Sequence, residues 1–132
     1  MKEAELLEIS EEAFSLLASP TYTVSVLADG EDATDTECAV LPLQDSPKRL
    51  LLAFANRSRA AALLHVGDKC NVSILRQSAP QSTEKRMVRA SNGTLYCPAC
   101  TNALICATVH ASIPFGQYTV YLTDVTEARF EQ

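Results

Sequence analysis

Two long stretches near the C-terminus decide the fold: ALICATVHASI at residues 103–113 and QYTVYLTDVTEARF at residues 117–130. Apolar side chains alternate with other residues along both stretches, and this period of two is typical of β-strands. Pro114, Phe115 and Gly116 stand between them and predict a turn. We therefore expect two long strands, joined by a turn, at the C-terminal end of the domain.

Earlier segments predict further strands. TYTVSVLADG at residues 21–30 alternates in the same way and closes on an Asp-Gly pair, which is typical of a hairpin turn. Residues 36–43 are the expected hairpin partner of this strand. The unbroken apolar run LLLAFA at residues 50–55 predicts a strand buried on both faces, and KCNVSIL at residues 69–75 predicts another strand. A polar run from Arg76 to Gly93 is expected to be the least ordered part of the chain.

Two short helices are predicted between these strands. SEEAFSLLA at residues 10–18 begins with a capping serine and two acidic residues and ends before a proline. The second helix covers Ala60 to Leu64, with Ser58 as its N-cap and Gly67 at its C-cap. About six strands and two short helices indicate a mainly β fold, and an antiparallel β-barrel with flanking helices leaves the fewest strand edges open.

Length and charge limit the functions that are open to the chain. Its 132 residues match one domain, so residues 1–132 are expected to form a single unit. The 11 basic and 16 acidic side chains give a net charge of −5 without any cluster of Lys and Arg, which argues against a nucleic-acid partner. MKEAELLEIS at the start lacks the features of a signal peptide, and no stretch approaches ~18 consecutive apolar residues. We therefore expect a cytoplasmic protein with no membrane association.

The segment FANRSR at residues 54–59 joins a buried strand to the start of a helix. Unpaired backbone N–H groups and the helix dipole favour an anion at such a point. Arg57, Ser58 and Arg59 stand there, and arginine forks match phosphate oxygens in a bidentate way. The sequence thus predicts either a phosphate site or a capped helix with two solvated arginines.

Other chemistry-bearing residues are less decisive. Neither His65 nor His110 lies in a recognisable ligand spacing, and the 4 glycines form no dinucleotide or nucleotide-triphosphate loop, so no catalytic side chain is predicted. Cys97 and Cys100 have the C-x-x-C spacing of zinc sites and redox dithiols, but no second pair follows at the usual spacing. Structural thiols, a redox pair and half of a metal site therefore stay open here, with structural thiols preferred and no metal site predicted.

The order of these segments resembles the flavin reductase-like family of FMN-binding split β-barrel proteins over roughly residues 10 to 130. The resemblance depends on the strand–Asn-x-Ser–helix unit that ends in Gly67 and NVSIL, and on the closing pattern Gly-x-x-Thr-Val-x-Leu-x-x-Val-x-x-Ala-Arg that begins at Gly116. It implies a split β-barrel homodimer with FMN, or alternatively FAD, in a groove between subunits. It also implies hydride transfer from NAD(P)H to the flavin, and an electron-accepting partner that the sequence does not identify.

The resemblance places the flavin phosphate at the strand-to-helix junction and the flavin ring against the segment around Thr36 to Val40. The residues that it implies for cofactor binding are Thr36, Glu37, Cys38, Ala39, Asn56, Arg57, Ser58, Arg59 and Tyr118. This chain departs from the family pattern at several of them. Cys38 and Ala39 stand where serines are usual, Glu37 adds a carboxylate, and Tyr118 stands where active reductases often have a histidine.

Two alternatives to a flavin reductase follow from these departures. The first is an FMN-binding electron carrier without a site for NAD(P)H, which the absent histidine and the short polar run favour. The second is a degenerate split barrel that binds no flavin and acts as a binding module. Retained flavin and its response to NADH distinguish the three.

Overall fold

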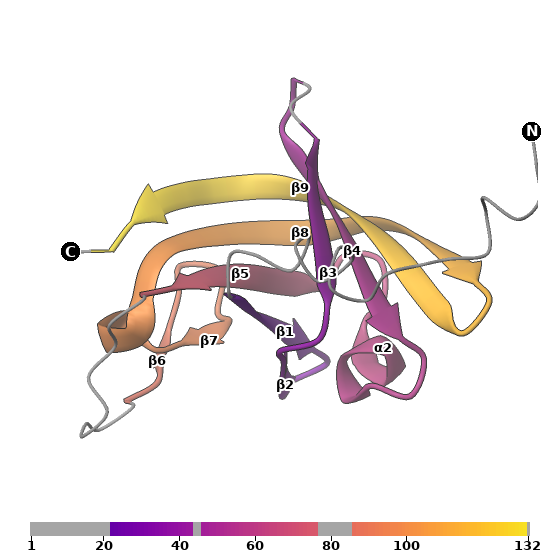
Figure 1. The fold of residues 1–132 in the computed structure, drawn as a ribbon, viewed down its shortest axis with the longest axis horizontal. Coiled ribbons are helices and arrows are strands. Elements are labelled where there is room, and N and C mark those ends of the chain that lie inside the picture. Colours follow the sequence, from indigo (N-terminus) through magenta and orange to yellow (C-terminus); the bar gives the residue numbers. More distant parts are fainter. Residues whose placement is uncertain (1–21, 44–45, 77–85, 132) are drawn as a thin grey trace, which may run out of the picture.

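The computed structural model describes residues 22–43, 46–76 and 86–131 of the chain. These residues form one antiparallel sheet of seven strands, in the order β2-β1-β5-β8-β9-β4-β3, and a separate two-stranded hairpin, β6-β7 (Figure 1). The strands of the sheet are β1 Tyr22–Ala28, β2 Glu31–Asp35, β3 Ala39–Leu43, β4 Arg49–Ala55, β5 Lys69–Leu75, β8 Thr101–Phe115 and β9 Tyr118–Phe130. The small hairpin consists of β6 Val88–Arg89 and β7 Leu95–Tyr96. The prediction of a mainly β, antiparallel fold is confirmed.

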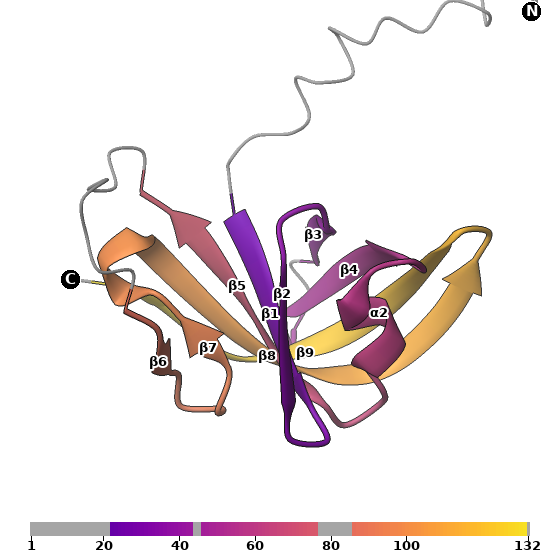
Figure 2. The same ribbon diagram turned by 90° about the horizontal axis from the view of Figure 1, so that it is seen from below.

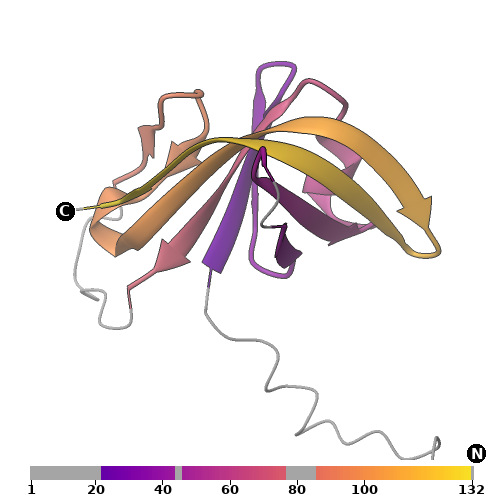
Figure 3. The same ribbon diagram turned by 90° about the horizontal axis from the view of Figure 1, so that it is seen from above.

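The hairpin of β8 and β9 is the longest feature of the sheet. Its pairing runs from Phe115 and Tyr118 at the tip to Ala103 and Phe130 at the far end, and Gly116 makes the turn with a φ of 62°. β5 pairs with β8 on one side, and β4 pairs with β9 on the other. Two register shifts in β8 bend the pair. Figure 3 shows the two ribbons arching across the whole width of the molecule.

The hairpin partner of β1 differs from the prediction. β1 pairs with β2, whereas the sequence predicts residues 36–43 as the partner. Asp29 and Gly30 have φ values of 54° and 79°, and a two-residue turn with both positions at positive φ returns the chain at once onto β1. The predicted segment is therefore divided. Its first residues connect the two edges of the sheet, and the rest forms β3, which pairs with β4.

The helix that follows β4 is where the sequence places it. α2 spans Arg59–Leu63, and Ser58 is its N-cap, because the Ser58 hydroxyl oxygen accepts a hydrogen bond from the backbone N–H of Ala61 at 3.1 Å. The predicted C-cap is wrong: Leu64 caps the helix in an extended conformation. Gly67 lies in the next turn with a φ of 95°, and its N–H donates to the Val109 carbonyl at 2.8 Å.

Two other predictions concern residues that lie wholly or partly outside the described ranges. The helix predicted at residues 10–18 lies outside the described residues. The polar run from Arg76 to Gly93 is described only in part, and within that part Val88 and Arg89 form β6, so this portion is more ordered than expected. None of the described helices has the length and apolar character needed to cross a bilayer.

The hydrophobic core lies on one face of the sheet, which we call the inner face. α2 packs there against β1, β2 and β4 (Figure 2). Phe54 and Tyr121 meet edge to face in this core, with ring centroids 5.8 Å apart. The buried residues of the core are Val24, Val26, Cys38, Leu50, Leu52, Phe54, Ala60, Leu64, Cys70, Val72, Ala107, Val109 and Tyr121.

In the part of the chain that the structure describes, the opposite, outer face is covered at one end only. There β6 and β7 lie over a second buried cluster of Ala90, Tyr96, Leu104 and Cys106. The amide of buried Asn71 holds this hairpin, because its Nδ2 donates to Thr94 Oγ1 at 2.7 Å and to the Leu95 carbonyl at 3.1 Å.

The outer face of β4 is not covered in the same way. Leu50, Leu52 and Phe54 are buried, whereas the residues that alternate with them are only half-buried. The prediction that residues 50–55 are buried on both faces is therefore wrong for the outer face. The expected count of six strands is also too low. Within the described residues the sheet is open, with β2 and β3 as its edge strands, and no closed barrel is found.

Replacement of Phe54, which has no exposed surface, tests the importance of this core. Phe54→Ala removes the partner of Tyr121 and leaves a cavity between β4 and β9, so we expect a loss of about 3–5 kcal/mol in the free energy of unfolding. Urea unfolding followed by circular dichroism measures it. Val66→Ala is the control, because Val66 is 63% exposed, and it should change stability by no more than about 0.5 kcal/mol. Equal effects of the two substitutions would contradict the assignment of the core.

Candidate functional site

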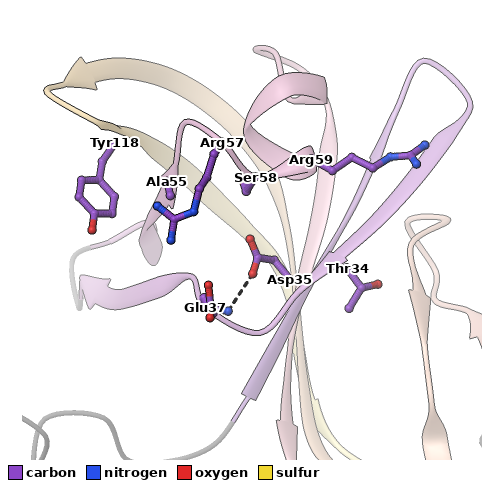
Figure 4. Close-up of a pocket in the computed structure, with 8 residues that line it drawn as sticks. All are labelled: Thr34, Asp35, Glu37, Ala55, Arg57, Ser58, Arg59 and Tyr118. Atoms are coloured by element: carbon purple, nitrogen blue, oxygen red, sulfur yellow. Dashed lines mark hydrogen bonds between the residues drawn. The ribbon is translucent and has the colours of Figure 1, made fainter.

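A pocket of about 510 Å³ opens where β4 passes into α2. The connection between β2 and β3 closes its opposite side, and the start of β9 closes one end (Figure 4). Its lining residues are Thr34, Asp35, Glu37, Ala55, Arg57, Ser58, Arg59 and Tyr118. A volume of this size lies within the range of about 300–1,000 Å³ that ligand sites usually have.

Two arginines give the pocket its cationic groups. Arg57 extends from the β4–α2 junction toward Glu37 and Asp35, whereas Arg59 extends away from Arg57, on the side of the pocket where Thr34 lies (Figure 4). Both arginines are exposed, and neither guanidinium has a hydrogen bond or ion pair with any residue in the described ranges. Guanidinium groups without a protein partner are available to an anionic ligand.

Ser58 lies between the two arginines, and its hydroxyl can both accept and donate a hydrogen bond. Its Oγ already accepts the N–H of Ala61, which fixes the start of α2. A hydroxyl that accepts one hydrogen bond can still donate its own hydrogen. Ser58 can therefore cap the helix and donate to a ligand oxygen at the same time.

Two carboxylates oppose the arginines across the pocket. Asp35 Oδ1 accepts the backbone N–H of Glu37 at 2.8 Å, so this N–H is not available to a ligand. The Glu37 carboxylate itself lies on the pocket side that Arg57 faces (Figure 4). Two guanidiniums and two carboxylates make the lining formally neutral, which disfavours a ligand with many negative charges.

Tyr22 positions the segment that carries Glu37. Its hydroxyl donates to the Cys38 carbonyl at 2.9 Å and accepts the N–H of Val40 at 3.0 Å. Burial raises the pKa of Tyr22, so the hydroxyl keeps the proton that it donates. This one side chain thus fixes the backbone between the pocket and β3.

Part of the predicted set of cofactor-binding residues comes together in the pocket. Glu37, Arg57, Ser58, Arg59 and Tyr118 all line it. The predicted residues that are not part of the lining are Thr36, Cys38, Ala39 and Asn56.

Cys38 and Asn56 are engaged elsewhere. The Cys38 thiol is buried, and burial raises its pKa to about 12, so it is a neutral core group. Asn56 connects the end of β4 to the β8–β9 tip: its Nδ2 donates to the Gly116 carbonyl at 3.2 Å, and its Oδ1 accepts from Thr119 Oγ1 at 2.7 Å. Asn56 therefore holds the tip, and with it Tyr118, beside the pocket.

Three lining residues were not predicted: Thr34, Asp35 and Ala55. Ala55 belongs to the predicted strand at residues 50–55, and its proximity to Arg57 in the sequence was a usable signal. Thr34 and Asp35 reach the pocket because β2 ends at Asp35. The sequence predicted residues 36–43 as the partner of β1, so it did not predict a strand that ends at this point.

The remaining candidates lie away from this pocket. His110 is exposed, with its Nδ1 3.3 Å from Asp124 Oδ2, and it does not line the pocket. The Sγ atoms of Cys97 and Cys100 are 3.0 Å apart. Within the described residues, no group of three or more His, Cys, Asp and Glu side chains is placed to hold a metal ion.

Comparison with known proteins identifies the fold. No protein-family model and no curated protein sequence matches this chain. Solved structures do match over nearly its whole length. The NADH:FAD oxidoreductase SgcE6 of Streptomyces globisporus superposes with a TM-score of 0.68 at 16% identity, covering 93% of this chain and 86% of its own. The styrene monooxygenase flavin reductase SMOB of Pseudomonas putida gives 0.69 at 12% identity, covering 92% and 86%.

A third structure extends the comparison. A Sinorhizobium meliloti protein assigned as an oxidoreductase superposes with a TM-score of 0.70 at 15% identity, and the match covers 93% of this chain. This chain spans about half of the length of that protein, 49%. The chain therefore has the fold of the flavin reductases, which confirms the resemblance inferred from the sequence.

Two buried thiols of the core make the stability of the fold depend on pH in the alkaline range. Burial raises the pKa of Cys38 and of Cys70 from 9.0 to about 12. Between these values the unfolded chain loses protons that the folded chain keeps, so the free energy of unfolding should fall as the pH rises from about 9 to about 12. Unfolding by urea across this range measures the slope. Cys38→Ala should make the decline less steep, and an unchanged slope would contradict the burial of this thiol.

Proposed function

We propose that this chain is a flavin-binding oxidoreductase of the flavin reductase type, which transfers a hydride from NAD(P)H to FMN. The observation that carries the proposal is the coincidence of two features. The fold matches flavin reductases over more than nine-tenths of the chain, and its pocket at the β4–α2 junction presents two unpaired guanidiniums. This junction also stands at the start of α2, where backbone N–H groups favour an anion, and this holds independently of the fold match.

The residues of the pocket fit a flavin with a single phosphate. Arg57 would bind the phosphate oxygens, and Ser58 would donate its hydroxyl hydrogen to one of them. Arg59, which extends away from Arg57 in Figure 4, would join them when its exposed side chain turns toward the ligand. The carboxylates of Asp35 and Glu37 restrict the charge that the pocket tolerates. The terminal phosphate of FMN presents three free oxygens to these groups, whereas each phosphorus of the FAD pyrophosphate has two, so FMN suits the site better than FAD.

A bound flavin supplies the two-electron chemistry, so the chain needs no acid or base of its own. The side chains have to orient the ring and exclude water from one face. Tyr118 lies 52% exposed at the mouth of the pocket, where its ring can stack against a planar ligand. The segment between β2 and β3, held by Tyr22, would lie along the other side.

We further propose that the open sheet is a split β-barrel and that two copies associate through its outer face. On that face the Arg49–Asp124 ion pair stands at one end of the β4–β9 pairing, and beyond it the cross-strand register places apolar side chains over β3, β4, β9 and the tip of β8. These residues are Ala39, Leu41, Leu51, Ala53, Ala55, Ala111, Ile113, Phe115, Tyr118, Val120 and Leu122. Phe115 is 73% exposed and Ile113 is 61% exposed. A continuous apolar surface of this kind is typical of a subunit interface.

The same face borders the pocket. Ala55 and Tyr118 are opposite each other in the β4–β9 pairing, and both also line the pocket. A second copy on this face would therefore complete the wall of the pocket beside Tyr118.

One observation favours a second candidate, an FMN-binding electron carrier. Asp35 and Glu37 add negative charge where a reduced nicotinamide nucleotide would bring further phosphates. The carrier and the reductase share the flavin site and differ only in their reaction with NADH.

FMN binding tests the assignment of the phosphate site. Arg57→Gln together with Arg59→Gln should weaken FMN binding at least about ten-fold, since each charge-assisted hydrogen bond contributes about 1.5–3 kcal/mol. Riboflavin lacks the phosphate, so its affinity should change less than about two-fold. Glu37→Gln should strengthen FMN binding by removing a repelling carboxylate. Equilibrium titration of flavin fluorescence measures all of these affinities.

Arg86→Gln is the matched control for that experiment, because Arg86 is exposed and does not line the pocket. Equal loss of FMN and riboflavin affinity in the double variant would disprove a phosphate role for the two arginines. Addition of NADH to the FMN complex without oxygen then decides between the two functions. Bleaching of the visible flavin absorption supports the reductase, and its persistence supports the carrier.

Sedimentation equilibrium tests the proposed dimer. Phe115→Asp places a charge in the middle of the apolar face and should convert the dimer into a monomer. Val66→Asp is the control, because Val66 is similarly exposed but lies outside that face, and it should leave the dimer intact. A wild-type chain that sediments as a monomer at micromolar concentration would refute association through this face.

A further inference from the structure

The Cys97-Pro98-Ala99-Cys100 turn is a well-formed feature that the proposed flavin chemistry does not use. Residues Pro98–Cys100 form a short 3₁₀ turn, η3, directly before β8. The Cys97 carbonyl accepts the N–H of Cys100 at 3.1 Å and the hydroxyl of Thr101 at 2.7 Å. These two bonds hold the ends of the turn together and bring the two cysteine side chains to the same side.

The two thiols are placed for a direct reaction with each other. Their Sγ atoms are 3.0 Å apart, and a disulfide bond has a length of about 2.05 Å. Closing the remaining distance of about 1 Å requires only small side-chain rotations. Thiols in this arrangement form a disulfide without any rearrangement of the strands around them.

Exposure separates this pair from the other cysteines. Cys97 and Cys100 are partly exposed, whereas Cys38, Cys70 and Cys106 are buried. Burial raises the pKa of each of the three buried thiols, so these remain protonated and shielded at neutral pH. A small oxidant in solution can therefore reach the pair and not the others.

A metal site does not explain the pair. Structural zinc needs four protein ligands, and in the described part of the chain no third His, Cys, Asp or Glu side chain joins the two thiols in a ligand group. The turn also lies far from the flavin pocket. β8 begins beside η3 and ends at the tip that carries Tyr118, at the opposite end of the sheet (Figure 1).

We propose that Cys97 and Cys100 form a reversible dithiol–disulfide site whose substrate is a low-molecular-weight disulfide of the glutathione class. The thiolate of one cysteine attacks a sulfur of glutathione disulfide, breaks its S–S bond and releases one glutathione thiolate. The second cysteine then loses its proton and attacks the mixed disulfide, which releases the second glutathione. The dithiol gives up two electrons and two protons, and glutathione disulfide becomes two glutathione molecules.

Oxidation would close the turn at the point where several elements meet. The Cys100 carbonyl accepts the N–H of Arg76 at 2.8 Å, and Arg76 directly follows the last residue of β5. β7 leads into the turn and β8 leaves it. A disulfide there would fix covalently the position at which the β6–β7 hairpin joins the sheet.

The test uses the folded full-length chain in buffers with a series of ratios of reduced to oxidised glutathione. After acid quenching, the remaining thiols are alkylated and the chain is mapped by mass spectrometry. We expect a single transition in which the peptide with Cys97 and Cys100 loses two hydrogen atoms, while the other three cysteines stay reduced. In native alkylation, the pair should also react at least about ten times faster than the buried thiols.

Single variants separate the two chemical steps. Cys97→Ser and Cys100→Ser should each stop at the mixed disulfide, with one glutathione on the remaining cysteine. Far-ultraviolet circular dichroism shows whether each variant is folded. If a variant does not fold, the peptide mapping of the wild-type chain alone tests the proposal. The proposal is overturned if the wild-type pair stays reduced at every ratio, keeps a glutathione adduct without closing, or binds zinc stoichiometrically when loaded with the metal. Flavin content plays no part in these measurements, so the outcome is independent of the flavin proposal.

Discussion

The long antiparallel pairing of β8 with β9 is the constraint on which the other elements depend. It runs without interruption of the strands from the tip at Phe115 and Tyr118 to Ala103 and Phe130, and it supplies the pairing edges for β5 and β4. β1 and β2 attach through β5, and β3 attaches through β4. Because β-bulges bend this pair, the attached strands curve around a common core instead of forming a flat sheet.

The curvature gives the two faces of the sheet different roles. The inner face is filled by the core around Phe54 and covered by α2, which stabilises the fold. Among the described residues, those of the β6–β7 hairpin, held by Asn71, cover the outer face at one end only. At the other end this face exposes apolar side chains from four strands, next to the pocket. Packing within one chain thus uses the inner side of these strands, whereas the proposed dimer would use the outer side.

The pocket depends on charged side chains that the fold brings together from two separate connections between its elements. Arg57 and Arg59 come from the β4–α2 junction, and Asp35 and Glu37 come from the connection between β2 and β3. Tyr22 fixes that connection through the backbone of Cys38 and Val40. The opposite charges do not neutralise each other by direct contact, because the guanidiniums form no ion pair within the described residues. In the proposed flavin complex these guanidiniums would hold the phosphate, and the two carboxylates would oppose a more highly charged ligand.

The sequence by itself determined the features that depend on near neighbours. The period of two predicted β8, β9 and β5, and Ser58 followed by good helix formers predicted the capped helix that places Arg57 and Arg59. Only the tertiary structure decided which strands pair. The Asp29-Gly30 turn gave β1 a different partner from the expected one, and this brought Asp35 to the pocket and left Cys38 in the core. It also decided that the residues of β4 that point to the outer face are only half-buried. Strand pairing and burial depend on residues far apart in the sequence, whereas periodicity and capping report only on residues a few positions apart.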